Sequence, residues 1–108
     1  MTRALLVVLA FTFAGAAQAR GDAEAGRRKA AEACAACHGA DGAKPSAPEN
    51  PILAGQHYDY LVKSLKDYRS GKRDNPVMKG FAAALSDRDI ENLAAWFASQ
   101  RSGLYVRR

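Results

Sequence analysis

The sequence predicts an all-α fold in one small domain, in which three main helices are separated by long loops. Two segments of the 108-residue chain repeat apolar side chains at the spacing of an amphipathic helix, and a third is rich in alanine, the strongest helix former. No segment shows the alternation of apolar and polar residues that is typical of a half-buried strand. This length is sufficient for one domain.

Residues 1–19 have the features of a signal peptide that is removed on export. Arg3 supplies a positive start, residues 4–17 are almost wholly apolar, and Ala-Gln-Ala at 17–19 is the small-x-small pattern that signal peptidase cuts. A membrane anchor is the alternative, but the apolar stretch is shorter than the roughly 20 residues that span a bilayer. We therefore expect a cleaved signal peptide, a domain at 20–108 and a periplasmic location.

The first helix of this domain is expected from Ala23 to about Ala36. Asp22 precedes it as an N-cap, because its carboxylate can accept the free N–H groups of the first turn and suits the positive end of the helix dipole. Residues 39–55 follow and are rich in glycine and proline, which predicts an extended loop. A loop of this length is uncommon in a compact domain and is often functional.

A second helix is expected from about Gln56 to Ser70, with Gly71 well placed to end it. Its apolar side chains form one stripe at helical spacing, and they are Tyr58, Leu61, Val62, Leu65 and Tyr68. The segment from Lys72 to Gly80 contains Asn-Pro and is expected to be a loop that carries Met78. A short turn of helix is expected to follow at residues 81–85.

The last helix is predicted to begin after Ser86 and to end near Gln100. Ser86 and Asp89 have the spacing of a capping box, in which each side chain accepts the other residue's backbone N–H. The apolar stripe of this helix consists of Ile90, Leu93, Ala94 and Phe97, with Trp96 at its border.

The segment Cys34-Ala35-Ala36-Cys37-His38 has the pattern by which a haem is attached covalently to a c-type haem protein. Two thiols three residues apart project from the same side of a helical turn, so both can reach the vinyl groups along one porphyrin edge. The imidazole that follows then points at the iron. We expect one haem c, bound through Cys34 and Cys37, with His38 as an axial ligand. A bulky cofactor would also complete the core of so small a domain.

Two other chemistries use a Cys-x-x-Cys pair. A thioredoxin-like redox site would need a preceding strand and a βαβ context, and the sequence indicates neither. A structural zinc ion would need four ligands, whereas only His38 and His57 add to the two cysteines as strong candidates.

Met78 is the expected second axial ligand. It is the one methionine of residues 20–108, and a methionine opposite the histidine gives a six-coordinate iron with a raised potential. His57 and Lys79 are the rival ligands, and a methionine that merely fills the core is the plain alternative.

The charge of the chain is modestly basic, with 16 lysines and arginines against 11 acidic residues. No basic run is interleaved with aromatic residues, so we expect no nucleic-acid partner. The excess is either a solvated surface or a weak means of steering the protein toward acidic redox partners.

Three stretches that cover nearly all of residues 20–108 resemble the class I c-type cytochromes. They are GDAEAGRRKAAEACAACHGADG, PILAGQHYDYLVKSLKDYRSGKR and MKGFAAALSDRDIENLAAWFASQ. The resemblance is close to one half of the dihaem bacterial cytochrome c4 and to small c-553-type monohaem cytochromes. It implies the class I cytochrome c fold, with three main helices and long loops around one covalently bound haem.

The resemblance also implies roles for single residues. Gly26 matches the small residue where the first helix crosses the last, and Leu93 and Trp96 match residues that pack into this crossing. Pro51 matches the proline whose carbonyl accepts the N–H of the ligand imidazole, which would fix the ring of His38. Leu53 matches a residue packed on the haem face, and Met78 matches the second iron ligand.

Arg73, Tyr58 and Tyr60 could bind the haem propionates, since a basic or hydroxyl group there would donate a hydrogen bond. The alternative for Arg73 is a solvated side chain, and for the tyrosines an ordinary core or surface position.

The expected function is that of a soluble periplasmic protein that carries one electron between redox proteins. We expect no catalytic site, no small-molecule substrate and a monomer or weak dimer. One alternative is a haem subunit or domain partner of a larger redox enzyme. The other is a haem enzyme or sensor with an open iron site, which would require that Met78 is not a ligand.

Overall fold

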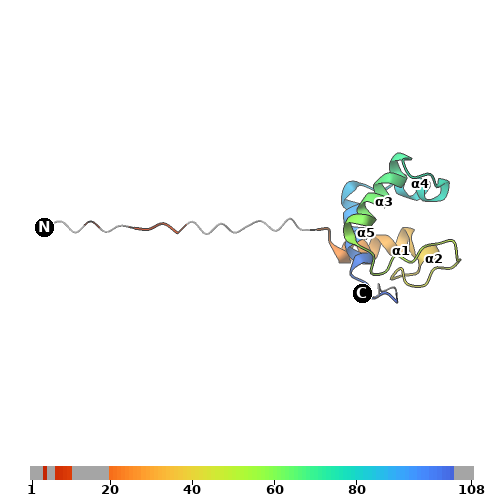
Figure 1. The fold of residues 1–108 in the computed structure, drawn as a ribbon, viewed down its shortest axis with the longest axis horizontal. Coiled ribbons are helices and arrows are strands. Elements are labelled where there is room, and N and C mark those ends of the chain that lie inside the picture. Colours follow the sequence, from red (N-terminus) through yellow and green to blue (C-terminus); the bar gives the residue numbers. More distant parts are fainter. Residues whose placement is uncertain (1–3, 5–6, 11–19, 104–108) are drawn as a thin grey trace, which may run out of the picture.

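The computed structural model describes residues 4, 7–10 and 20–103 and shows five helices within them (Figure 1). The helices are α1 (Ala23–Ala33), α2 (Ala35–His38), α3 (Tyr58–Ser70), α4 (Pro76–Ala83) and α5 (Asp87–Ala98). No strand occurs among these residues, so the predicted all-α class is confirmed. The predicted cleavage site at 17–19 lies outside the described residues.

α1 and α5 cross at close range, and a glycine permits the approach. A Cβ atom on Gly26 would lie 1.9 Å from the carbonyl oxygen of Asn92 and 2.9 Å from the Cβ of Trp96. Leu93 is almost fully buried and belongs to the same core cluster as Ala30 of α1. The roles predicted for Gly26, Leu93 and Trp96 are therefore confirmed.

The predicted helix ends have the expected caps. The Asp22 carboxylate accepts the backbone N–H of Glu24 at 2.9 Å, and Ser86 and Asp89 form the capping box at the start of α5. Gly71 ends α3 in the left-handed region with φ of 83°, which a residue without a side chain adopts at little cost. The predicted first helix is divided at Cys34, whose φ of −117° departs from helical geometry and separates α1 from α2.

The prediction of a loop from Lys72 to Gly80 is wrong, because α4 begins within it and Met78 lies on this helix. The Asn75 side chain caps the helix by accepting the N–H groups of Val77 and Met78, each at 3.1 Å. Pro76 occupies the first helical position, where its missing N–H costs nothing. The predicted turn at 81–85 is in fact the end of α4 and the two residues after it.

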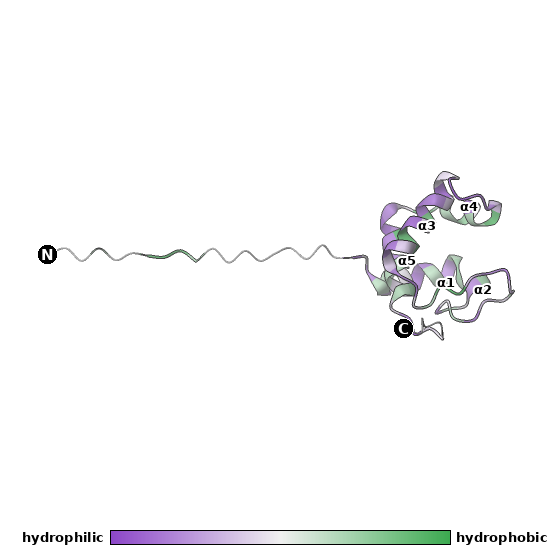
Figure 2. Ribbon diagram, viewed as in Figure 1, coloured by the Kyte–Doolittle hydropathy of each residue, from purple (hydrophilic) through white to green (hydrophobic). Residues whose placement is uncertain are grey.

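The core lies along α5, which contacts both α1 and α3. Its buried members are Ala30, Leu61, Leu85, Ile90, Leu93, Ala94 and Phe97. α4 packs on α3, and α2 on α1, so the molecule has two arms that extend from the core (Figure 1). α4 contains hydrophobic residues, which are drawn in green in Figure 2.

No helix within the described residues combines the length and the apolar composition that are needed to cross a membrane.

Candidate functional site

A cavity of about 540 Å³ lies between the two arms. Its walls come from α2 and the loop after it on one side, from α3 and α4 on the other, and from α5 at the base. The structure brings seven of the predicted site residues to this cavity, namely Cys34, Cys37, His38, Pro51, Leu53, Arg73 and Met78. Apolar side chains supply most of the remaining wall, among them Leu61, Leu65, Val77, Phe81, Leu85 and Phe97.

His38 is held in a fixed orientation at the cavity wall. Its side chain is buried, with 6% of the residue exposed, and its Nδ1 lies 2.9 Å from the carbonyl oxygen of Pro51. Donation from Nδ1 to this carbonyl leaves Nε2 as the nitrogen available to a metal ion. The hydrogen bond has the partners that the family resemblance implied.

The two cysteines lie on the turn that leads into His38. The backbone N–H groups of Cys37 and His38 both donate to the carbonyl of Cys34, at 3.2 and 3.0 Å. Both thiols are free and half-buried. Burial, and then the neighbouring Cys37, raises the pKa of the Cys34 thiol to about 11. This thiol is therefore protonated at neutral pH.

The loop after α2 is tied back to the cysteine turn. Ser46 donates its backbone N–H to the carbonyl of Cys37 at 3.0 Å, and the Asn50 side-chain amide donates to the same carbonyl at 3.1 Å. Together they fix the loop that carries Pro51. The extended loop predicted at 39–55 is thus a wall of the site.

Met78 lines the cavity from α4, across from the arm that carries His38 (Figure 1). Neither rival ligand lines the cavity. His57 precedes α3 and is exposed, and Lys79 extends toward Gly71. Of the three candidate ligands Met78, His57 and Lys79, Met78 is the one that lines the cavity.

Arg73 reaches the rim of the cavity, whereas Tyr58 and Tyr60 do not line it. The Tyr58 ring instead lies beneath the guanidinium of Arg20, 5.2 Å from its Cζ. Sequence reasoning missed Glu49, Ser64, Tyr68 and Asn75 as cavity residues. Tyr68 could have been found from the apolar stripe of α3, but nothing in the sequence pointed to the other three.

The two alternative uses of the cysteine pair lack their structural context. No strand precedes the pair in the described part of the chain, as a thioredoxin-like site requires. The same residues contain no cluster of three or more His, Cys, Asp or Glu side chains that could hold a metal ion.

The cavity fits a haem. Its volume lies within the roughly 300–1,000 Å³ of cofactor pockets, and its wall is predominantly apolar. Two thiols, an oriented imidazole and a thioether sulfur are the side chains that attach a c-type haem and ligate its iron.

A family model described as cytochrome C oxidase, cbb3-type, subunit III, matches residues 21–97. The chain belongs to this family of c-type cytochromes. The family and the two cysteines are consistent with a single covalently bound haem c in this cytochrome.

Three relatives define the likeness further. Cytochrome c4 of Pseudomonas aeruginosa is 52% identical over 97 residues, which are 90% of this cytochrome and 46% of the relative. Cytochrome c-554(548) of Halomonas halodenitrificans is 46% identical over 83 residues, 74% of this chain and 98% of the relative. A thiosulfate dehydrogenase electron acceptor of Stutzerimonas stutzeri is 49% identical over 72 residues, 67% of this chain and 33% of the relative.

The crystal structure of reduced recombinant cytochrome c4 from Pseudomonas stutzeri superposes with a TM-score of 0.70. It is 43% identical, and the match covers 78% of this cytochrome and 48% of that chain. The class I cytochrome c fold is thereby confirmed. The chain spans about half the length of the cytochrome c4 relatives that it matches. These relatives support an electron-transfer cytochrome.

Proposed function

We propose that this cytochrome is an exported, periplasmic carrier of single electrons whose haem iron is ligated by His38 and Met78. One observation carries the proposal: a single, mainly apolar cavity is lined by Cys34, Cys37, His38 and Met78. Bound haem supplies an iron that alternates between the ferric and ferrous states. The chain has no catalytic role of its own in this proposal.

Each cavity residue has a defined task in the proposal. Cys34 and Cys37 form the thioethers that hold the cofactor. The Pro51 carbonyl orients His38 and raises the basicity of its ring. Leu53 and the other apolar side chains exclude water, which lowers the local dielectric and disfavours the extra charge of ferric iron. The location rests on the signal-peptide pattern of residues 1–19, and protein isolated from the periplasm should therefore begin at Arg20.

A second candidate is that the chain serves as a partner subunit or domain of a larger redox enzyme. The relative named as a thiosulfate dehydrogenase electron acceptor favours it, as does the fact that the cytochrome c4 relatives are about twice as long. Isolation of the native protein decides between the two: a free carrier elutes alone, and a subunit elutes in a stoichiometric complex.

Iron ligation is tested with Met78→Ala. The variant should keep its covalent haem but lose the near-infrared charge-transfer band of methionine-ligated ferric haem. Val77→Ala is the matched control, because Val77 is the preceding residue of α4 and also lines the cavity. His57→Ala and Lys79→Ala should keep the band. An unchanged spectrum in Met78→Ala would show that another group ligates the iron.

Covalent attachment is tested with Cys37→Ala, which should lower the yield of holoprotein and leave at most one thioether by mass spectrometry. Full covalent attachment in this variant would contradict the assignment.

A further inference from the structure

Among the described residues that line the cavity, Arg73 is the one permanently cationic side chain and Glu49 is the one carboxylic acid. Arg73 lies just after the turn that ends α3, and its backbone N–H donates to the carbonyl of Asp67 at 3.0 Å. This bond turns the chain back along α3, so that the long side chain of Arg73, although exposed, runs beside the helix.

Three side chains of α3 hold the guanidinium of Arg73. Its Cζ lies 4.7 Å from the centroid of the Tyr68 ring, within the range of a cation–π contact. Its Nη1 donates to the hydroxyl of Tyr60 at 3.4 Å and to that of Ser64 at 3.3 Å. Residues 60, 64 and 68 are spaced four apart, so they form one row along the helix.

The contact between Arg73 and Tyr60 has an electrostatic consequence. The hydrogen bond from Arg73 lowers the pKa of the Tyr60 phenol, although the side chain is half exposed. Within the described residues, both hydrogen bonds of the guanidinium use Nη1, which leaves Nε and Nη2 to donate to another acceptor.

The cavity supplies that acceptor when it is filled. A haem carries two propionate carboxylates, and a planar guanidinium binds a carboxylate through two parallel hydrogen bonds. An uncompensated propionate favours ferric over ferrous iron because its negative charge stabilises the more positive metal. A cation that is fixed beside the propionate removes this preference and so raises the reduction potential.

We propose that Tyr68, Tyr60 and Ser64 are positioning residues that hold Arg73 at the cavity rim, where it pairs with a haem propionate and raises the reduction potential. The inference rests on the proposed function, since it requires a haem in this cavity. It adds a specific device that sets the driving force for electron transfer.

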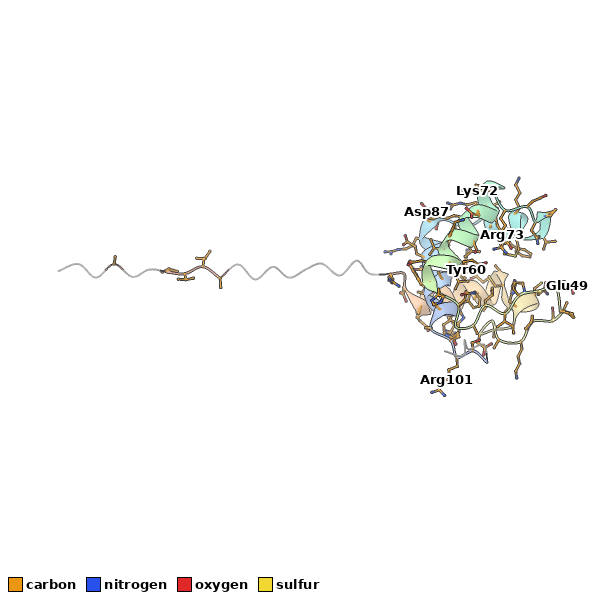
Figure 3. All side chains as sticks on the ribbon, viewed as in Figure 1. Glu49, Tyr60, Lys72, Arg73, Asp87 and Arg101 are labelled. Atoms are coloured by element: carbon orange, nitrogen blue, oxygen red, sulfur yellow. The ribbon has the colours of Figure 1, made fainter. Side chains whose placement is uncertain are left out.

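The experiment compares reduction potentials of purified holoproteins by spectroelectrochemistry at pH 7. Arg73→Gln should lower the equilibrium constant for reduction about tenfold, which is about 59 mV for one electron. Lys72→Gln is the matched control, since it removes one positive charge from the adjacent position of the same turn but not from the cavity (Figure 3). This control should change the constant by less than about twofold, as expected for an exposed and screened charge.

A double-mutant cycle tests the positioning role of Tyr68. Tyr68→Leu should lower the potential in the wild-type background and should have no further effect when Arg73 is already glutamine. Tyr68→Phe keeps the aromatic face and should keep the wild-type potential. A Tyr68→Leu shift of equal size in both backgrounds would mean that the ring acts by packing, and the inference would be overturned.

The failure of this inference can be distinguished from failure of the proposed function. If Arg73→Gln and Lys72→Gln shift the potential equally while both retain covalent haem and the methionine band, only the role of Arg73 is lost. If wild-type protein lacks the band, the proposed ligation fails first. Should Arg73→Gln not yield holoprotein, unchanged potentials in Tyr68→Leu and in the Tyr60→Phe, Ser64→Ala double variant would still overturn the inference.

Discussion

Among the glycines of the described residues, Gly26 is the one at which an added Cβ would make the shortest contact. The Cβ of an alanine there would lie 1.9 Å from the carbonyl oxygen of Asn92, on the backbone of α5. Backbone cannot rotate away as a side chain can, so the two helices would have to separate. We expect Gly26→Ala to lower the free energy of unfolding by about 3 kcal/mol. Guanidinium unfolding of the holoprotein, followed by circular dichroism at 222 nm, measures the change.

Gly80 provides the control for this prediction. It lies inside α4, and a Cβ built there would meet no heavy atom within 4 Å. Gly80→Ala should therefore raise the free energy of unfolding by about 0.5–1 kcal/mol, because alanine favours helix over glycine. Equal effects of the two substitutions would show that the crossing of α1 and α5 tolerates a shift.

The cofactor-binding cysteines and His38 could be predicted from sequence because covalent attachment demands a fixed spacing within one turn of helix. The surroundings of Arg73 could not be predicted in the same way. Tyr68 and Arg73 come together because the chain reverses at Gly71, and a sequence pattern does not fix how far the returning segment lies along the helix.

Among the elements, α4 matters most for the proposed iron site because it carries Met78. Asn75 caps it by accepting the N–H groups of Val77 and Met78. We expect Asn75→Ala to lower the free energy of unfolding by about 1 kcal/mol. The substitution should also weaken the near-infrared methionine band, because the capped turn holds the ligand. Band intensity and guanidinium midpoints measure the two effects.

Two variants separate the effect on Met78 from a general loss of stability. Asn75→Asp keeps an N-cap acceptor and should keep the band. Asp22→Ala removes the cap of α1, which does not carry Met78, and should cost similar stability without weakening the band. If Asp22→Ala weakens the band as much as Asn75→Ala does, the cap of α4 has no special relation to the ligand.

The sequence signal at α4 was ambiguous in a physical sense. Asn followed by Pro is typical of a turn, but the same two residues are also a good N-cap and a good first helical residue. Eight residues form a helix too short to show clear periodicity. The packing of α4 on α3 decides the outcome, and that contact is not local in sequence.

A charged link connects the end of α3 to the start of α5 and makes stability depend on pH. The Arg69 guanidinium donates to the Leu85 carbonyl at 3.1 Å and to the Asp87 carboxylate at 2.6 Å. The hydrogen bond from Arg69 to the Asp87 carboxylate holds the pKa of Asp87 below its ordinary value of 3.8. The ionised carboxylate therefore stabilises the folded state above pH 3.8, and this contribution is lost as the pH falls through the lowered pKa.

Asp87→Asn tests the link. The variant should have a lower guanidinium midpoint than wild type at pH 7, and the difference should shrink as the pH falls below 3.8. When Arg69 is already glutamine, the further substitution Asp87→Asn should lower the guanidinium midpoint less at pH 7, and this change should be nearly independent of pH. A gap between wild type and Asp87→Asn that stays constant from pH 7 to pH 2 would rule out the ion pair as its source.

At the scale of the whole molecule, the two arms meet mainly through α5. α2 packs on α1, α4 packs on α3, and α5 contacts α1 and α3. The space between the arms is the cavity of about 540 Å³. The fold therefore depends on what fills this cavity as well as on its own core.

The size of the cavity leads to a prediction about removal of the cofactor. Without haem, the mainly apolar wall of this cavity of about 540 Å³ would face water, and burial of that surface would no longer stabilise the fold. Small domains are stable by only about 5–15 kcal/mol in total. The chain without haem should consequently not keep this structure. The Cys34→Ala, Cys37→Ala double variant, freed of haem, should lose most of its helical circular dichroism and its cooperative thermal transition. Met78→Ala, which retains the attached haem, should keep both the helical circular dichroism and the cooperative transition. A haem-free variant that melted as cooperatively as the holoprotein would show that the helices are stable without a filled cavity.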